Sequence, residues 1–372
     1  MRTNPFASAG IIESEERAPR LVLEANRGHW NIERGPRLER AIFRNDLSPA
    51  EALELCISTE GEMDIVTEVS PADAARVIAS DHAKLVVCDA NRVLVGIINR
   101  YPSDVPLHDT RVRKALNLAV DRQKVIALGL GGYANPLCAL TPSWCGGFPS
   151  DREAYTHDPE QARRLLLDEG GWPAGRNLRI ATPGPFEGIA RLVAADVQAA
   201  LGIGIDVMVA PPEQLLAGTR MLVEKKLVPP WDMLIFGWFD LSSEAPPAAI
   251  HREFFGSDGA FRAGPELPEF NRLYAEMAAQ IDRQKLVRVA KQIDRYVFDE
   301  VLALFLCAPQ ALYAVNTHVN FGPYRTTFEL AETEVDQQHW SRRRTQDDPQ
   351  AAQAPASKGS ASFTSGSAGN AC

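Results

Sequence analysis

Hydrophobic and polar positions in the first hundred residues alternate between strand-like and helix-like periods. Short runs rich in β-branched residues predict strands at 21–26, 41–46, 63–69, 84–89 and 93–99. Helical spacing predicts helices at 49–58 and 71–80, and the second helix begins with Pro71 behind Ser70 as its N-cap. This first segment is therefore expected to be of mixed α/β type.

The pattern changes after Pro102 and Pro106. Apolar residues then recur at helical spacing over 110–128, which predicts one long helix and a boundary near residue 107. Beyond it, helices alternate with strands in the order 159–170, 178–183, 186–201, 205–210, 212–224 and 232–238. Such an alternation predicts an open α/β sheet.

The C-terminal part contains two long helical patterns, 266–281 and 284–300, followed by strands at 301–306 and 312–315. From 342 the chain becomes polar and rich in small residues, so it is predicted to be a disordered tail. These changes divide the chain into four parts: 1–106, 107–311, 312–341 and 342–372.

Composition excludes several classes of protein. The 372 residues are 45% hydrophobic, enough for substantial cores. A net charge of -9, with both signs mixed along the chain, provides no basic stripe for nucleic acid. No apolar run approaches the roughly 20 residues that span a bilayer. The first ten residues lack the basic start and apolar run of an export signal, so the chain as written is predicted to stay in the cytoplasm.

The sequence contains no recognisable motif for catalysis or metal binding. The six cysteines have no zinc-type spacing, so neither a metal nor another cofactor is predicted. Cys138 and Cys145 flank a loop, and either a small disulfide or two unpaired thiols fits them. One of these thiols with His157 as a base is the remaining enzymatic hypothesis, and spacing alone does not support it. The chain is predicted not to be an enzyme.

Several segments, in this order, resemble the extracellular solute-binding proteins of family 5, which serve ABC importers. The strongest is 107–136, which resembles the family pattern D-x-R-V-R-x-A-x-x-x-A-[IV]-D-R. The segment 8–44 resembles the family's strand with Asn26 and Trp30 at matching positions, and 231–240 resembles its strand and cleft loop. Further similar segments lie at 61–77, 157–172 and 193–209.

This resemblance implies a two-lobe periplasmic-binding-protein-like architecture, of the class II peptide-binding type, with part of lobe I missing. Residues 1–106 would be partial lobe I, 107–311 lobe II and 312–341 a return to lobe I. The implied function is that of the solute-binding component of an ABC importer, which captures peptides or a similar small solute in a hinge-closed cleft. The implied partners are permease subunits in the membrane, without insertion of the chain itself, and the implied location is the periplasm.

The alternative hypothesis is a truncated, non-transporting remnant or an interaction module without a complete binding pocket. The resemblance covers about the C-terminal two thirds of such a protein, from residue 4 to 340. Strands that lobe I needs would then be absent, and an unpaired sheet edge favours association.

Two candidate ligand contacts follow the strand predicted at 232–238. Trp238, at the strand's end, is a stacking surface for a solute, or alternatively a core tryptophan. The resemblance implies that Asp240 pairs with a ligand ammonium, and the alternative is a loop or helix-cap aspartate. Only Phe239 separates the two, where many peptide-binding members have two residues, so the specificity for peptides stays open.

Three further candidates come from other segments. Asn99 and Arg100 are expected where the last strand of lobe I runs toward the hinge, with Arg100 as a clamp for a carboxylate or, alternatively, as a surface residue. Trp144 is a candidate second aromatic wall of the cleft. The charged motif residues are expected to form ion pairs and to register the lobes rather than to touch ligand: Asp109, Arg111, Arg113 and Asp121.

Overall fold

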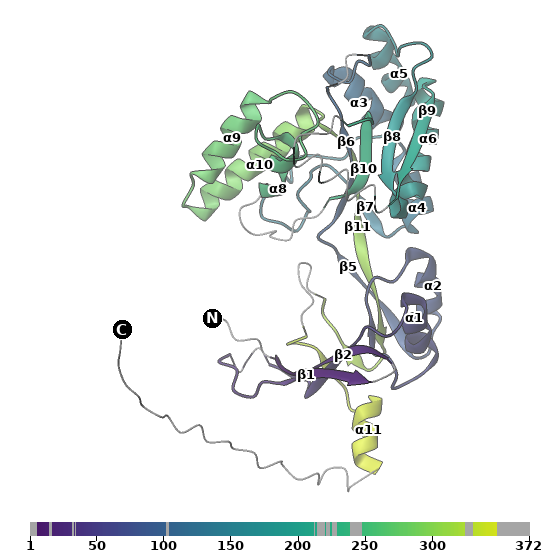
Figure 1. Ribbon diagram of the computed structural model, residues 1–372, viewed down its shortest axis with the longest axis vertical. Helices are drawn as coiled ribbons and strands as arrows, with labels where there is room; N and C mark the ends of the chain where they lie inside the picture. The colour runs from purple at the N-terminus through teal and green to yellow at the C-terminus, as the bar shows by residue number, and fades with distance from the viewer. Residues whose placement is uncertain are drawn as a thin grey trace, which may run out of the picture.

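The computed structural model describes residues 6–14, 17–31, 33, 35–101, 104–211, 213, 220, 224, 229–238, 248–323 and 330–347. They form an upper and a lower body, as seen in Figure 1, joined by long strands that run from one to the other. Within these residues, no helix combines the length and the apolar character needed to span a membrane.

The upper body is built on a sheet in the order β11-β6-β10-β8-β9. Its strands are β6 (Val93–Ile98), β8 (Leu178–Pro183), β9 (Ile205–Ala210), β10 (Met233–Trp238) and the first part of β11 (Ala303–Asn316). β8, β9 and β10 run parallel to one another, whereas β6 is antiparallel to β10 and β11. This arrangement confirms the predicted open α/β sheet.

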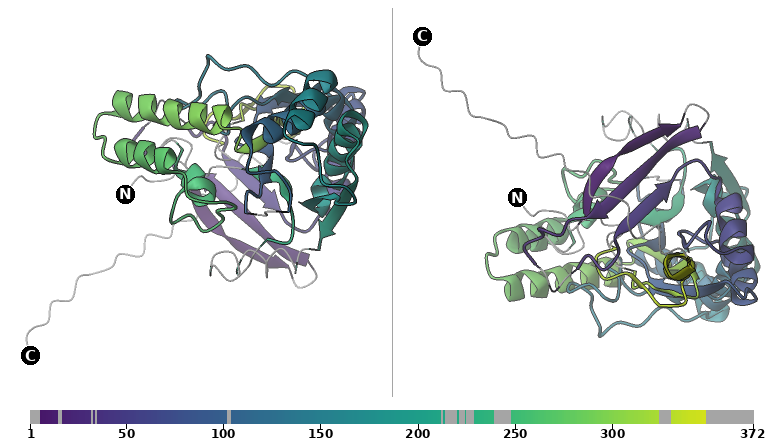
Figure 2. Two further views of the ribbon diagram at one scale, coloured as in Figure 1. Left: turned by 90° about the horizontal axis from the view of Figure 1, so that it is seen from above. Right: turned by 90° about the horizontal axis from the view of Figure 1, so that it is seen from below.

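Helices cover both faces of the upper sheet (Figures 1 and 2). One face carries α3 (Thr110–Ala119), α4 (Arg122–Leu130), α5 (Pro159–Asp168) and α6 (Glu187–Leu201). The other carries α8 (Ala249–Phe255), α9 (Pro268–Ala278) and α10 (Arg283–Asp299). Alternate β6 side chains supply both cores, with Leu94 and Ile98 in the first and Val95 and Ile97 in the second. Burial on both faces explains the unbroken apolar run of this strand.

The lower body contains two further sheets and four short helical elements. Its strands are β1 (Phe6–Ser14), β2 (Arg17–Ala25), β3 (Arg40–Arg44), β4 (Ile65–Val66), β5 (Ala83–Asp89), β12 (Val319–Asn320) and β13 (Glu334–Val335). Its helices are α1 (Pro49–Ser58), η1 (Pro71–Asp73), α2 (Ala74–Ile78) and α11 (Trp340–Asp347). The sheet β1-β2-β3 and α11 lie at the end farthest from the upper body (Figure 1).

β11 connects the two bodies. Its residues 303–307 pair with β6, 307–309 with β7 (Ala134–Pro136), and 310–316 with β5. The prediction of two separate strands here is wrong. Pro309 interrupts the apolar pattern, but a proline is tolerated because the strand changes partners at this point. The pairing places the crossing between the bodies at 90–92, earlier in the chain than the predicted boundary near 107.

The single helix predicted over 110–128 is also wrong, because α3 and α4 are separate. Val120 has an extended backbone, and the Asp121 side chain accepts a hydrogen bond from the Lys124 amide as the N-cap of α4. The Arg122 guanidinium donates to the carbonyl oxygens of Asn117 and Val120, which lie at the end of α3. Capping therefore outweighs an apolar spacing that would suit a continuous helix.

Other predicted elements agree closely with the structure, notably α1, β5, α5, β8, α6 and β9. The strand expected at 63–69 shrinks to β4, and most of the helix expected at 212–224 lies outside the described residues. α11 continues to Asp347, so order extends beyond 342, the predicted start of the tail.

Candidate functional site

The parallel strands β8, β9 and β10 end at one edge of the upper sheet, at Pro183, Ala210 and Trp238. We call this the carboxyl edge. Trp238 lies opposite Val93, where β6 enters the upper sheet directly after the crossing from the lower body. The carboxyl edge therefore faces the lower body (Figure 1). In open α/β sheets, ligands bind outside the carboxyl ends of the strands, so this edge is the candidate site.

Trp238 closes the carboxyl edge with its indole ring packed into the core. The residue is 3% exposed, and its ring centroid lies 4.3 Å from that of Phe254 and 5.5 Å from that of His251. Phe255 and Phe236 complete the aromatic cluster around it. The packing agrees with the alternative of a core tryptophan. A solute would meet this ring only after a local rearrangement.

A buried histidine–aspartate pair supports this aromatic cluster. His251 Nε2 lies 3.0 Å from Asp294 Oδ1, and each residue is 1% exposed. The Leu140 amide donates to the same carboxylate oxygen at 3.0 Å. The pair joins α8 to α10 next to Trp238. Sequence reasoning missed it because His251 and Asp294 are 43 positions apart and match no motif.

The loop that contains Trp144 is attached to the crossing between the bodies. Trp144 is half-buried, and its Nε1 donates to the carbonyl oxygen of Ala90 at 3.2 Å. Ala90 directly follows β5 and precedes β6. Trp144 thus lies at the same end of the upper sheet as Trp238. Asp240 lies outside the described residues.

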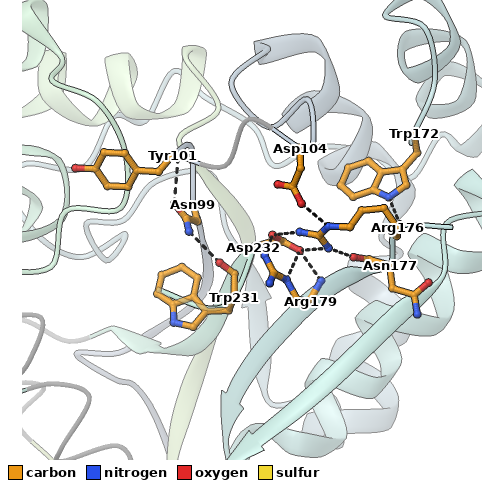
Figure 3. A network of polar contacts seen from close by, with 9 residues as sticks. All are labelled: Asn99, Tyr101, Asp104, Trp172, Arg176, Asn177, Arg179, Trp231 and Asp232. Carbon is orange, nitrogen blue, oxygen red and sulfur yellow. Dashed lines mark hydrogen bonds and ion pairs between the residues drawn. The ribbon is translucent and has the colours of Figure 1, made fainter. Parts of the chain in front are cut away.

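Asn99 and Arg100 lie at the opposite end of the upper sheet. β6 ends at Ile98, opposite Met233, so the whole strand separates them from the carboxyl edge. The prediction that they lie toward the hinge is wrong, because β6 belongs to the upper sheet and runs away from the crossing. The Asn99 amide group is occupied by backbone, since it donates to the Trp231 carbonyl and accepts from the Tyr101 amide. Figure 3 shows this arrangement.

Next to Asn99, Asp232 is the centre of an ion-pair network (Figure 3). Its carboxylate has no exposed surface and accepts from Arg176 at 2.8 Å and from Arg179 at 2.9 Å, while Arg176 also pairs with Asp104. Burial opposes ionisation of Asp232, but hydrogen bonds from Arg179 and Arg176 outweigh it and lower the pKa of this carboxyl. The network fixes the amino end of β10 and leaves Asp232 no free acceptor for a ligand.

Sequence comparison decides the family. Residues 11–259, more than half of the chain, match the bacterial extracellular solute-binding proteins, family 5, in the middle part of that family. The chain belongs to this family. The recognition made from the sequence motifs is confirmed.

Two curated relatives are named for peptide binding. The chain is 26% identical over 288 residues to the probable di/tripeptide-binding protein 5 of Pseudomonas aeruginosa, a match that covers 74% of this chain and 51% of that protein. It is also 26% identical over 168 residues to the dipeptide-binding protein of Escherichia coli, covering 45% of this chain and 30% of that protein. The chain thus spans about half the length of these relatives or less.

Solved structures of the family share the fold. The substrate-binding protein CtaP of Listeria monocytogenes superimposes with a TM-score of 0.72 at 18% identity, covering 89% of this chain and 66% of that one. NikA of Brucella suis, solved with Fe(III)-EDTA, gives 0.71 at 19% identity, covering 89% and 68%. The predicted α/β, two-lobe fold of periplasmic binding proteins is confirmed. We therefore call the upper body lobe II and the lower body lobe I.

The motif of this family at 109–122 performs a structural task. The buried Arg113 guanidinium donates to backbone carbonyls of Val301, Leu107, His108 and Glu300 and to the Thr110 hydroxyl. Arg122, also buried, donates to carbonyls of Phe305, Asn117, Val120 and Tyr155. Asp109 and Asp121 cap α3 and α4. These contacts attach α3 and α4 to β11 and to the residues just before it, so the motif fixes the position of these helices within lobe II.

The described residues offer little chemistry for metals or catalysis. Among them, no three His, Cys, Asp or Glu side chains gather where they could hold a metal ion. Cys138 is a thiol, and burial raises its pKa, which disfavours the thiolate that a nucleophile requires. His157, the suggested base, instead faces Asp121 at 3.9 Å. Members of this family are substrate-binding proteins, consistent with a role in binding rather than catalysis.

Proposed function

We propose that the chain is the solute-capturing component of an ABC importer for peptides or a similar small solute. The observation that carries this proposal is the carboxyl edge of lobe II, which faces lobe I in a chain that belongs to family 5. The names of the curated relatives support peptides as the class of solute.

In this proposal the solute binds between the carboxyl edge and lobe I. Trp144 provides aromatic surface at this end of the upper sheet, Trp238 joins it after the local rearrangement that exposes its ring, and Asp240 pairs with an ammonium group of the solute. Exclusion of water between closed lobes strengthens such an ion pair. The extended strands at the crossing act as the hinge, and a solute that binds the closed form more tightly shifts the equilibrium toward it.

The proposed division assigns residues before the crossing at 90–92, together with those after 310, to lobe I. The rest of the described chain belongs to lobe II. The permease subunits of the importer would recognise the closed form, and capture would take place in the periplasm. Asn99 is assigned a structural role, because both ends of its amide group already bind backbone.

A thermal-melting series with the purified chain tests the proposal. Trialanine, dialanine, glutathione and a nickel–EDTA chelate are titrated separately, because a ligand that binds only the folded state raises the melting temperature. We expect a saturable rise with at least one peptide, and its loss in Asp240→Asn. A cooperative melt that responds to none of the four would favour the non-transporting remnant instead.

A further inference from the structure

Arg100 is a buried cation at the end of lobe II opposite the carboxyl edge. It is 7% exposed, its Nε atom has no hydrogen-bond partner, and no carboxylate of the described residues pairs with its guanidinium. The Arg100 amide donates to the Ala263 carbonyl at 3.0 Å. A Cβ atom added to Gly264 would lie only 2.7 Å from Arg100 Cζ. The 263–264 backbone thus packs directly against the guanidinium.

Arg262 brings a second cation to the same place. Its Nη1 atom is buried and has no hydrogen-bond acceptor in the described part of the chain. Among the described residues, the carboxylate that pairs with Arg262 is that of Glu266, with 3.5 Å between Arg262 Nη1 and Glu266 Oε1. The Glu266 side chain is 64% exposed. Burial first, and then the positive charges of Arg113 and Arg262, lower the pKa of Arg100 to about 10. Arg262 directly precedes the 263–264 backbone that packs against Arg100, so the chain brings both incompletely satisfied guanidinium groups to this end of lobe II.

The other buried arginines of lobe II show how this fold normally satisfies such a group. Arg113 and Arg122 are buried to a similar degree, and each guanidinium donates to four backbone carbonyl oxygens. Arg100 and Arg262 have no comparable set of acceptors. Burial of a charged group without acceptors is destabilising, because the group loses its hydration and gains no hydrogen bond in return. An anion that binds both groups would remove much of that cost.

We propose that Arg100 and Arg262 bind a small oxyanion, either a carboxylate or an inorganic phosphate. A guanidinium group presents a planar fork of N–H donors, which suits two oxygens of one anion. This site is separate from the proposed solute site. The residues of β6 span about 17 Å at ~3.3 Å each, too far for one dipeptide to reach from Trp238 to Arg100.

The test is thermal melting of the whole chain at pH 7 and constant ionic strength, with sodium chloride replaced stepwise by sodium acetate or sodium phosphate. We expect a saturable rise in melting temperature with one of the two oxyanions, and the more effective one identifies the class of ligand. The apparent affinity should fall at least about tenfold in Arg100→Gln and in Arg262→Gln. Arg288→Gln, which removes an exposed arginine of α10, should keep the wild-type response.

Two results would overturn the proposal. One is a wild-type chain that melts identically in chloride, acetate and phosphate. The other is an oxyanion response of wild-type size in Arg262→Gln, which decides the matter even if Arg100→Gln does not fold. A separate titration with trialanine distinguishes failure of this proposal from failure of the proposed function. A chain that does not bind trialanine can still bind the oxyanion.

Discussion

The two ends of β10 are held by different kinds of contact. At the amino end, Asp232 accepts directed, charge-assisted hydrogen bonds from Arg176 and Arg179. At the carboxyl end, Trp238 packs among aromatic rings, with the directed contacts of the His251–Asp294 pair beside it. Directed bonds fix one geometry, whereas ring contacts tolerate displacement. The comparison indicates that the amino end is the rigid frame of lobe II and the carboxyl end the adaptable edge.

The largest expected effect is at the rigid end. Asp232→Ala leaves two arginines without their buried partner, so the free energy of unfolding should fall by about 3 kcal/mol or more. Urea denaturation followed by circular dichroism measures this. Asp104→Asn is the matched control, because among the described residues Asp104 pairs with Arg176 and its side chain is 58% exposed, so its loss should be below about 1 kcal/mol. Equal losses in both variants would show that Asp232 does not hold the amino end more strongly than the exposed Asp104 does.

The next effect concerns the directional pair beside Trp238. His251→Leu leaves Asp294 buried without its partner, and unfolding should become about 2–3 kcal/mol easier. The double variant His251→Leu, Asp294→Leu should recover part of this loss, because no unpaired carboxylate is then buried, although the Leu140 amide still loses its acceptor. A double-mutant cycle with urea denaturation provides the coupling energy. Strict additivity would show that the two side chains do not depend on each other.

A smaller effect is expected at the adaptable edge itself. Trp238→Phe keeps an aromatic ring in the cluster, so the cost in stability should be about 1–1.5 kcal/mol. If the indole stacks on solute, peptide affinity measured by calorimetry should fall by a larger factor than this stability loss explains. Phe255→Leu, a change in the same cluster behind Trp238, is the control and should leave affinity unchanged.

The smallest effect is a dependence on pH. Because the pKa of Asp232 is lowered in the folded chain, its ionised form stabilises the fold above the unfolded pKa of about 3.9. That contribution is lost as the pH falls below about 4, through the folded pKa. The stability difference between wild type and Asp232→Asn should therefore narrow between pH 5 and 3 in urea titrations. A constant difference over this range would contradict the assignment.

Local patterns predicted individual elements well. Apolar periodicity located α1, β8, α6 and β9 because each of these elements buries one or both faces against a core. Such burial requires apolar residues at a fixed spacing, which is visible in the sequence. It failed at β11, where a proline interrupts the pattern although the strand continues with another partner. Periodicity reports the burial of each residue but not the partner that buries it.

The candidate site shows the same limit. Trp238 was predicted at the end of its strand, and it lies there, while Asn99 and Arg100 were expected nearby and lie at the other end of the sheet. Strand direction depends on pairing with β10 and β11, whose paired residues lie 135 to 213 positions later in the chain.

The sequence by itself determined the family, the α/β class and most helices and strands, because motifs, caps and apolar spacing act over a few neighbouring residues. Only the tertiary structure decided which strand ends face the other lobe, how His251 meets Asp294, and why Arg113 is satisfied while Arg100 is not. Those outcomes depend on strand register and on contacts between distant segments, and no local pattern encodes them.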